Sequence, residues 1–479
     1  MPRLLQLLSL LLLLSLLPVS VATAWQQRVE YSMEITLDVP AHSYDGKQTL
    51  RYTNNSPDTL GEVFYHLYYE AFRPGSAMDR RNASLPDGHL RIGNLSPDEQ
   101  GQVKVAAMAQ DGTPVAWRVE ETILRVQLAQ PLLPGRSTSL SMVWRTRIPK
   151  LTRRGGWMSN ERVEFSMAQW YPKLCEYDAS GWHNDEYLGR EFYGVWGDFD
   201  VAITLPARYV VGATGAVTNP QEVRCGYEVQ FPSNDPSEPS VRGARASDTP
   251  MPIVDPLGTP FPPPITYRDT IISQPAKGET GMKTWRFRAE NVHDFAWVAD
   301  PDYIHRIAEW KGITFHFLVK QSTAFAWGNA PEYTIRSMEY FARRFGAYTY
   351  PQFTVAMAGD GGMEYPMLIM ITGNRGEQSL ASVIAHELGH QWFYGMVANN
   401  ETQEAWMDEG FTQFLTEEAM RNVLFPMQTN PFTGLDAMIY PWDDHPWHDV
   451  ESTYGLTIGG FIEPLSTFHD WHTDGRTAT

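Results

Sequence analysis

The chain has 479 residues, of which 43% are hydrophobic and 20% charged, which is typical of a globular protein with two or three domains. Its 38 basic and 56 acidic residues give a formal net charge of −18, which excludes nucleic acid and anionic membrane surfaces as expected partners. The two cysteines, Cys175 and Cys225, are too few for a thiolate zinc cage. They form either one disulfide or two buried thiols.

The first 24 residues have the pattern of a secretory signal peptide. Arg3 precedes an apolar run over residues 4–17, and residues 22–24 form an A-x-A cleavage site. We therefore expect export to the periplasm or the extracellular space, with a mature chain that starts near Trp25. A retained membrane anchor is the alternative, but the run is short for a membrane span. The sequence contains no other apolar run of about 18 residues, so no stable span is expected after cleavage.

Residues 25–302 are expected to form an all-β domain, built as a sandwich or saddle of sheets. Apolar side chains recur at every second position from Tyr31 to Leu37, and similar short alternating runs follow between Asn, Pro, Asp and Gly residues. Residues 232–265 break this pattern, since they are rich in Pro, Ser and Asp and have no period. They are expected to be an insertion within the β-domain.

After residue 302 the apolar period changes, and residues 303–479 are expected to form an α/β domain. The pattern predicts strands and helices in alternation, with helices at 330–348, 379–397 and 406–425 and strands at 352–359 and 366–373. Either Ser379 or Ser382 is expected to cap the second helix. The last fifty residues are rich in Pro, Gly, Asp and aromatic side chains and show no helical period.

The second of these helices contains the sequence HELGH. Its two histidines, His386 and His390, are four residues apart, so both imidazoles lie on one face of a helix and can bind one Zn²⁺. Glu387 lies beside the first ligand and can take a proton from a water at the metal. The pattern alone is moderately specific, because a catalytic zinc normally has a third protein ligand.

Glu409 is the expected third ligand. It follows His390 after 18 residues, and on a second, antiparallel helix this spacing returns its carboxylate to the metal. A histidine in this role would require the longer pattern in which the helix motif is followed by glycine and a third histidine. Phe393 and Met396 occupy those two positions, so that class is excluded.

The combination HELGHQWF, 18 residues and then EGF resembles the gluzincin aminopeptidases of the aminopeptidase N family. A second motif agrees, because residues 361–366 read GGMEYP where the family has glycine-x-methionine-glutamate-asparagine. The resemblance implies that Glu364 binds the α-amino group of the substrate, and that the backbone of Gly361 and Gly362 lies along an extended peptide. Tyr365 replaces the usual asparagine, which leaves the glutamate in place.

A weaker match lies in the β-domain, where residues 165–174 read FSMAQWYPKL. In the family this segment carries a Gln or Glu that helps to bind the substrate's amino terminus. The resemblance therefore assigns Gln169 to this role. The alternative is an ordinary glutamine on an edge strand.

The family also uses a tyrosine hydroxyl, placed after the third ligand at the start of a helix, to stabilise the oxyanion. Tyr454 and Tyr440 are the candidates within the chain, and Tyr454 is preferred. Neither has the expected lysine, glycine and helix after it. We therefore expect the catalytic domain to be incomplete at its C-terminal end, with the tyrosine beyond Thr479.

These observations predict an α+β multidomain fold, in which the β-domain precedes a partial, thermolysin-like zinc domain. The expected function is that of a zinc aminopeptidase with one Zn²⁺ per chain and peptides with a free amino terminus as substrates. Two alternatives remain open: an endopeptidase on the same scaffold, and a protein that binds zinc and peptide without turnover. The oligomeric state and the preferred first residue do not follow from the sequence.

Overall fold

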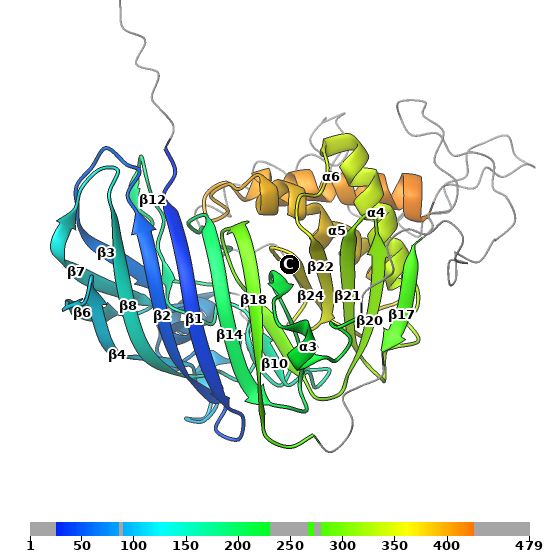
Figure 1. Cartoon of the computed structure of the whole chain (residues 1–479), viewed down its shortest axis with the longest axis horizontal. Coiled ribbons are helices and arrows are strands. Elements are labelled where there is room, and N and C mark those ends of the chain that lie inside the picture. The colour runs from blue at the N-terminus through cyan, green and yellow to red at the C-terminus, as the bar shows by residue number, and fades with distance from the viewer. Residues whose placement is uncertain (1–24, 86–89, 230–266, 273–278, 426–479) are drawn as a thin grey trace, which may run out of the picture.

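A computed structural model of the chain describes residues 25–85, 90–229, 267–272 and 279–425 (Figure 1). The expected signal peptide and the Pro-rich insertion at 232–265 lie outside the described residues, as do Tyr440 and Tyr454. Within them, β-sheets form the first part of the chain, and a mixed sheet with helices forms the second (Figure 1). The expected fold class is therefore confirmed.

The largest sheet has eight strands in the order β16-β18-β14-β1-β2-β8-β4-β5. Its first strand shows why the segment is β: the side chains alternate strictly between buried and exposed, with Tyr31, Met33 and Ile35 in the core. The bounds are β1 (Arg28–Asp38), β2 (Ser43–Thr53), β4 (Gln102–Gln110), β5 (Thr113–Pro114), β8 (Ser137–Arg147), β14 (Gly197–Pro206), β16 (Ala216–Val217) and β18 (Met282–Val292).

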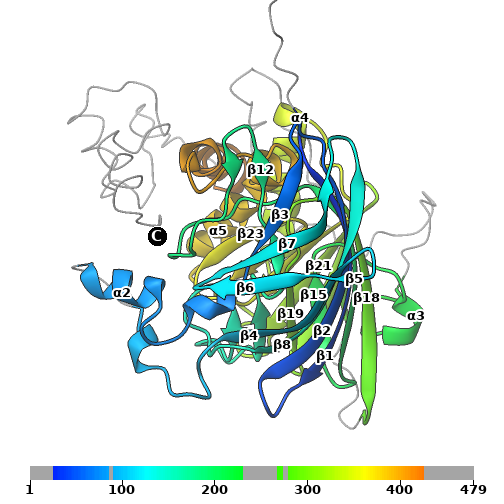
Figure 2. The same cartoon turned by 90° about the vertical axis from the view of Figure 1, so that its left-hand side faces the viewer.

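Smaller sheets complete the β-domain. One has the order β15-β19-β10-β9, a second has the order β11-β3-β7-β6, and β12 pairs with β13. Figure 2 shows β3, β6 and β7 on the side of the molecule that faces the viewer. The strand bounds are β3 (Leu60–His66), β6 (Ala116–Glu120), β7 (Ile123–Leu132), β9 (Gly156–Trp157), β10 (Phe165–Met167), β11 (Lys173–Leu174), β12 (Tyr177–Asp178), β13 (Gly181–Trp182), β15 (Val210–Ala213) and β19 (Trp297–Asp300). The short helices are η1 (Tyr68–Ala71), α2 (Ala77–Ser84), η2 (Ile92–Asn94) and α3 (Pro220–Val223).

The second part is built on a six-stranded sheet in the order β17-β20-β21-β22-β24-β23. Its strands are β17 (Arg268–Ile272), β20 (Tyr303–Trp310), β21 (Ile313–Lys320), β22 (Gln352–Met357), β23 (Gly362–Tyr365) and β24 (Leu368–Ile371). The last strand of the β-domain ends at Asp300, and the next strand, β20, begins at Tyr303 in this second sheet. β17 also belongs to the second sheet, although its residues lie within the segment expected to form the β-domain. β23 is an edge strand, and it comprises the four central residues, 362–365, of the GGMEYP motif.

Three helices belong to this part: α4 (Ala330–Phe345) and α5 (Glu377–Gly389) contact the sheet, and α6 (Glu409–Ala419) packs on α5 (Figure 1). Shorter turns are η3 (Gln391–Met396), η4 (Ala405–Met407) and η5 (Met420–Leu424). Helix α5 packs against α4 and α6 and against strands β23 and β24. Helix α5 therefore lies between the edge strand β23 and helix α6.

Two features of α5 differ from the sequence expectation. The helix begins directly after Gly376, whose carbonyl accepts from the Leu380 amide, so neither Ser379 nor Ser382 is the N-cap. The backbone also leaves the helical conformation at Phe393 and Tyr394, so the segment 379–397 is not one continuous helix.

Two further expectations concern cysteine pairing and membrane spans. Cys175 and Cys225 are both free thiols. In the described ranges, none of the helices has the length and apolar character needed to span a bilayer.

Candidate metal centre and substrate site

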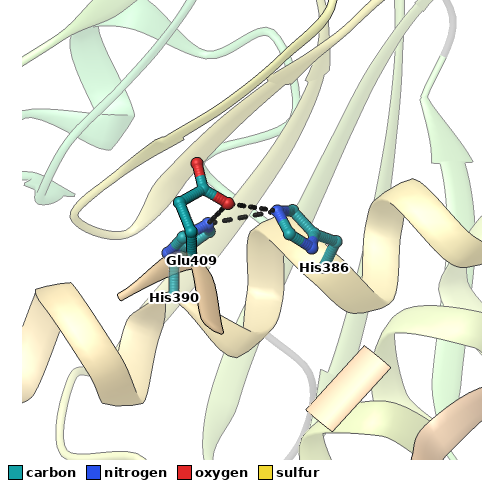
Figure 3. Close-up of side chains that lie close together, drawn as sticks. All are labelled: His386, His390 and Glu409. Carbon is teal, nitrogen blue, oxygen red and sulfur yellow. Dashed lines mark hydrogen bonds and ion pairs between the residues drawn. The ribbon is translucent and has the colours of Figure 1, made fainter. Parts of the chain in front are cut away.

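Three side chains converge where α5 meets the start of α6 (Figure 3). Glu409 Oε2 lies 3.1 Å from His386 Nε2 and 3.6 Å from His390 Nε2, and the two Nε2 atoms are 3.3 Å apart. His386 lies on α5 and His390 directly follows its last residue in a helical conformation, so helix spacing explains the pair, and Glu409 is the first residue of α6. The three residues predicted to hold the metal are therefore brought together.

Two threonines on α6 contact the Nδ1 atoms of the histidines, while the Nε2 atoms face Glu409. Thr416 Oγ1 lies 3.3 Å from His386 Nδ1, and Thr412 Oγ1 lies 3.3 Å from His390 Nδ1. The Thr416 hydroxyl donates its own proton to the Thr412 carbonyl at 2.8 Å, so its oxygen accepts from His386 Nδ1. His386 then has a lone pair on Nε2, which is the tautomer that a metal ligand needs.

The electrostatics of this cluster also fit a bound cation. Burial raises the pKa of Glu409, but hydrogen bonds from His386 and His390 outweigh burial and hold that pKa well below its ordinary value. Burial lowers the pKa of His390, but the carboxylates of Glu364 and Glu409 outweigh it and raise that pKa well above its ordinary value. The cluster thus favours positive charge at its centre. Two nitrogens and one carboxylate oxygen are the ligand set of a catalytic zinc.

Glu387 lies between this cluster and the edge strand β23. A Cβ added to Gly362 would lie 1.8 Å from Glu387 Oε1, so only glycine leaves room for the carboxylate. A Cβ on Gly361 would meet no atom within 4 Å, so the steric demand falls on Gly362 alone. Burial, followed by the neighbouring Glu364 carboxylate, raises the pKa of Glu387 well above its ordinary value. Such a carboxyl can take up a proton and give it back.

Glu364 faces the same region from β23. One of its carboxylate oxygens lies within 4.8 Å of a ring nitrogen of His390. Its Oε1 atom is buried and has no hydrogen-bond partner among the residues that the structure describes. A buried acceptor without a donor is costly, so this oxygen is able to accept a hydrogen bond from water or from a ligand.

Arg154 ties β23 to the β-domain. Its guanidinium donates to the Gly362 carbonyl and to Glu191, and its backbone amide donates to Asp360. The side chains of Arg154 and Glu191 are 10% and 6% exposed, so the ion pair is largely shielded from water. Glu191 also lines a cavity of about 430 Å³, together with Tyr68, Tyr187, Phe192 and other residues.

Gln169 enters the site from the segment after β10. It is buried and its backbone has a positive φ of 53°. Its amide nitrogen donates to Asp294 and to the Tyr365 hydroxyl, which leaves Oε1 buried and without a partner in the described ranges. It is therefore not an ordinary edge-strand glutamine.

Several of these residues were not predicted from the sequence. Thr412 and Thr416 repeat the four-residue spacing of the two histidines on the facing helix, which is a usable signal. Arg154 and Asp294 carry no local signal, because each reaches the site from a distant part of the chain. The candidates for an oxyanion donor, Tyr440 and Tyr454, lie outside the described residues.

Comparison with known sequences identifies one family. Residues 329–431 match the peptidase family M1 domain. Leukotriene A-4 hydrolase of Xenopus laevis is 35% identical over 133 residues, which are 26% of this chain and 20% of that protein. Aminopeptidase B of Rattus norvegicus is 36% identical over 87 residues, which are 17% of this chain and 13% of that protein. The matched segments therefore span one fifth or less of these relatives. The family match at residues 329–431 contains the motifs that carried the resemblance.

A solved structure agrees on the fold. A two-domain M1 zinc metallopeptidase variant bound to L-arginine has a TM-score of 0.51 with this chain at 17% identity, and the match covers 82% of this chain and 71% of that one. At this identity the likeness establishes the fold. It extends the match from the catalytic part into the β-domain.

Proposed function

Because residues 329–431 match the peptidase family M1 domain, we propose that the chain is a zinc aminopeptidase of this family. It hydrolyses the first peptide bond of peptides that carry a free amino terminus. The observation that carries the proposal is the convergence of His386, His390 and Glu409, with Glu387 and the unpartnered oxygen of Glu364 beside them.

Each residue has a distinct role in this proposal. His386, His390 and Glu409 hold one Zn²⁺, which when bound supplies Lewis acidity to a water and to a peptide carbonyl. Glu387 takes a proton from the attacking water and delivers it to the leaving amine. The raised pKa of Glu387 supports this role, because the carboxyl must hold the proton between the two transfers.

The amino terminus of the substrate supplies the donors that the site lacks. An ammonium group between Glu364 Oε1 and Gln169 Oε1 would satisfy two buried acceptors at once. Among the described strands none pairs with the outer side of β23, and although Arg154 holds the Gly362 carbonyl, the backbone after Gly362 can pair with an extended peptide. Fixing the ammonium and the backbone together aligns the first peptide bond with Glu387.

The proposed setting is outside the cytoplasm. The pattern of residues 1–24 supports export, and the substrates are then peptides of the periplasm or the extracellular space. The oxyanion donor is proposed to be a tyrosine, with Tyr454 as the candidate inside this chain.

The first experiment separates turnover from binding alone. The 479-residue chain and its Glu387→Gln variant are purified, their zinc content is measured, and both are assayed with a leucine-derived chromogenic amide. The proposal predicts one zinc per chain in both proteins. It also predicts that kcat in Glu387→Gln is lower by a factor of about 10²–10⁴, which is the usual contribution of a general base.

Two results would contradict the proposal in different ways. A chain that binds zinc but has no activity above that of Glu387→Gln is a binding protein. A chain whose activity is unchanged in Glu387→Gln uses another base. The Glu404→Gln variant serves as a control, because Glu404 is an exposed glutamate between His390 and Glu409, and its carboxylate accepts from the Trp406 indole.

A further inference from the structure

A second buried charged pair lies behind the substrate site. Lys173 Nζ is 2.7 Å from Asp294 Oδ2, and the two side chains are 3% and 0% exposed. Lys173 belongs to β11, and Asp294 lies in the turn between β18 and β19. Burying two charges costs more than burying apolar side chains of the same size. The pair therefore calls for a role beyond packing.

The Asp294 carboxylate is held by four donors. Oδ2 accepts from Lys173 and from Gln169 Nε2 at 3.0 Å. Oδ1 accepts from the Tyr171 hydroxyl at 3.0 Å and from the Phe295 amide at 2.8 Å. A carboxylate with both oxygens bonded on two sides cannot rotate without losing hydrogen bonds.

This fixed carboxylate determines which way the Gln169 amide points. The amide nitrogen donates to Asp294 and also to the Tyr365 hydroxyl at 3.1 Å, so both of its hydrogens are used. The reversed amide would place its carbonyl oxygen against Asp294 Oδ2, where two acceptors repel each other. Only one orientation is therefore compatible with the network, and it leaves Oε1 free to accept.

Tyr365 connects this network to the residue that binds the amino group. It directly follows Glu364 in β23 and is fully buried. Its hydroxyl meets Gln169 from the catalytic sheet, while Asp294 meets the same amide from the β-domain. The amide is thus held between the two parts of the protein, by Asp294 on one side and by the residue that follows Glu364 on the other.

We propose that Lys173, Asp294 and Tyr365 are positioning residues that fix the Gln169 amide, so that Oε1 faces the substrate's ammonium group. The inference rests on the proposed function, since it deepens the account of the amino-terminus site. Its consequence is selectivity for a free amine. An oriented carbonyl oxygen accepts from an ammonium group, whereas a freely rotating amide would present its NH₂ group as often as its oxygen. The network therefore makes the site select substrates by their free amine.

The test uses binding, so that it does not depend on turnover. Affinities for leucine amide and for 4-methylpentanamide, which lacks only the amine, are measured by calorimetry on the zinc-loaded chain in a Glu387→Gln background. The double variant Lys173→Met with Asp294→Leu removes the pair without leaving a buried unpaired charge. It is expected to reduce the preference for leucine amide about tenfold, as loss of one hydrogen bond to a charged group would. Tyr365→Phe, a milder change, is expected to reduce the preference about threefold.

The matched control is another lysine–aspartate pair, Lys320 and Asp300, which are 2.6 Å apart with side chains 14% and 1% exposed and do not bond to the Gln169 amide. Lys320→Met with Asp300→Leu should leave the preference unchanged. A purely structural role would weaken both ligands equally in the Lys173 and Asp294 variant. If the Glu387→Gln chain prefers leucine amide, and neither the Lys173 and Asp294 double variant nor Tyr365→Phe changes this preference, the inference is wrong. If the background itself shows no preference, the proposed amino-terminus site is wrong.

Discussion

The two halves of the site are built in different ways. The metal half comes from 24 consecutive residues, His386 to Glu409, on two packed helices. The substrate half joins residues from distant segments, including Arg154, Gln169 and Glu364. The first half is therefore determined by helix spacing. The second depends on how the β-domain docks on the edge strand β23.

This contrast indicates where changes will act. A substitution in the metal half should alter zinc affinity. A substitution in the substrate half should leave zinc bound and alter the alignment or the selection of the peptide. The predictions below test that separation.

The largest effect is expected at Gly362, where the two halves touch. In Gly362→Ala the new methyl group would lie 1.8 Å from Glu387 Oε1, so the flexible carboxylate must move away. We expect kcat to fall by about 10²–10⁴, as for loss of a general base, with zinc content and thermal stability nearly unchanged. Steady-state kinetics and metal analysis measure these outcomes.

Gly361→Ala is the matched control, because its added Cβ meets no atom within 4 Å. Its kcat should stay close to that of the unmodified chain. Equal losses in the two variants would show that strand flexibility matters here rather than the position of Glu387.

A smaller effect is expected at Thr416, on the metal side. Thr416→Val keeps the shape of the side chain but removes the oxygen that accepts from His386 Nδ1. Loss of such a supporting hydrogen bond typically weakens metal affinity about 10-fold to 100-fold. Competition with a zinc chelator measures this change, and the preference for a free amine should not change.

Thr334→Val controls for loss of a helical threonine. Thr334 is buried on α4, and its hydroxyl donates to the Ala330 carbonyl at 2.8 Å, as that of Thr416 does to Thr412. Thr334→Val should not alter zinc affinity. Similar weakening in both variants would assign the effect to helix stability.

The sequence was sufficient for the metal half because its spacing is local. Two histidines four apart and Glu409 after 18 residues converge on adjacent helices, and the edge strand with Glu364 packs against the same helix. The β-domain was also predictable, since Tyr31, Met33 and Ile35 alternate into the core as expected. Family resemblance supplied the roles of Glu364 and Gln169.

What the sequence did not reveal depends on long-range contacts. Asp294 bonds to Gln169 across 125 positions, and Arg154 reaches Gly362 across 208. No periodic pattern encodes such pairs. The start of α5 was misplaced for a local reason: a serine is a common N-cap, but here the helix begins after Gly376, without a side-chain cap.

The most direct test of the central claim measures whether Glu364 selects a free amino terminus, as proposed. The ratio of kcat/KM for a dipeptide amide over its N-acetyl derivative is measured for the unmodified chain, for Glu364→Gln and for Glu339→Gln. The last variant is the control, because Glu339 is a buried glutamate on α4 that pairs with Lys311. We predict a strong preference that falls about 100-fold in Glu364→Gln, as for loss of one partner of a buried charge pair, and is retained in Glu339→Gln. Equal cleavage of the free and acetylated peptides by the unmodified chain would contradict the account and indicate an endopeptidase.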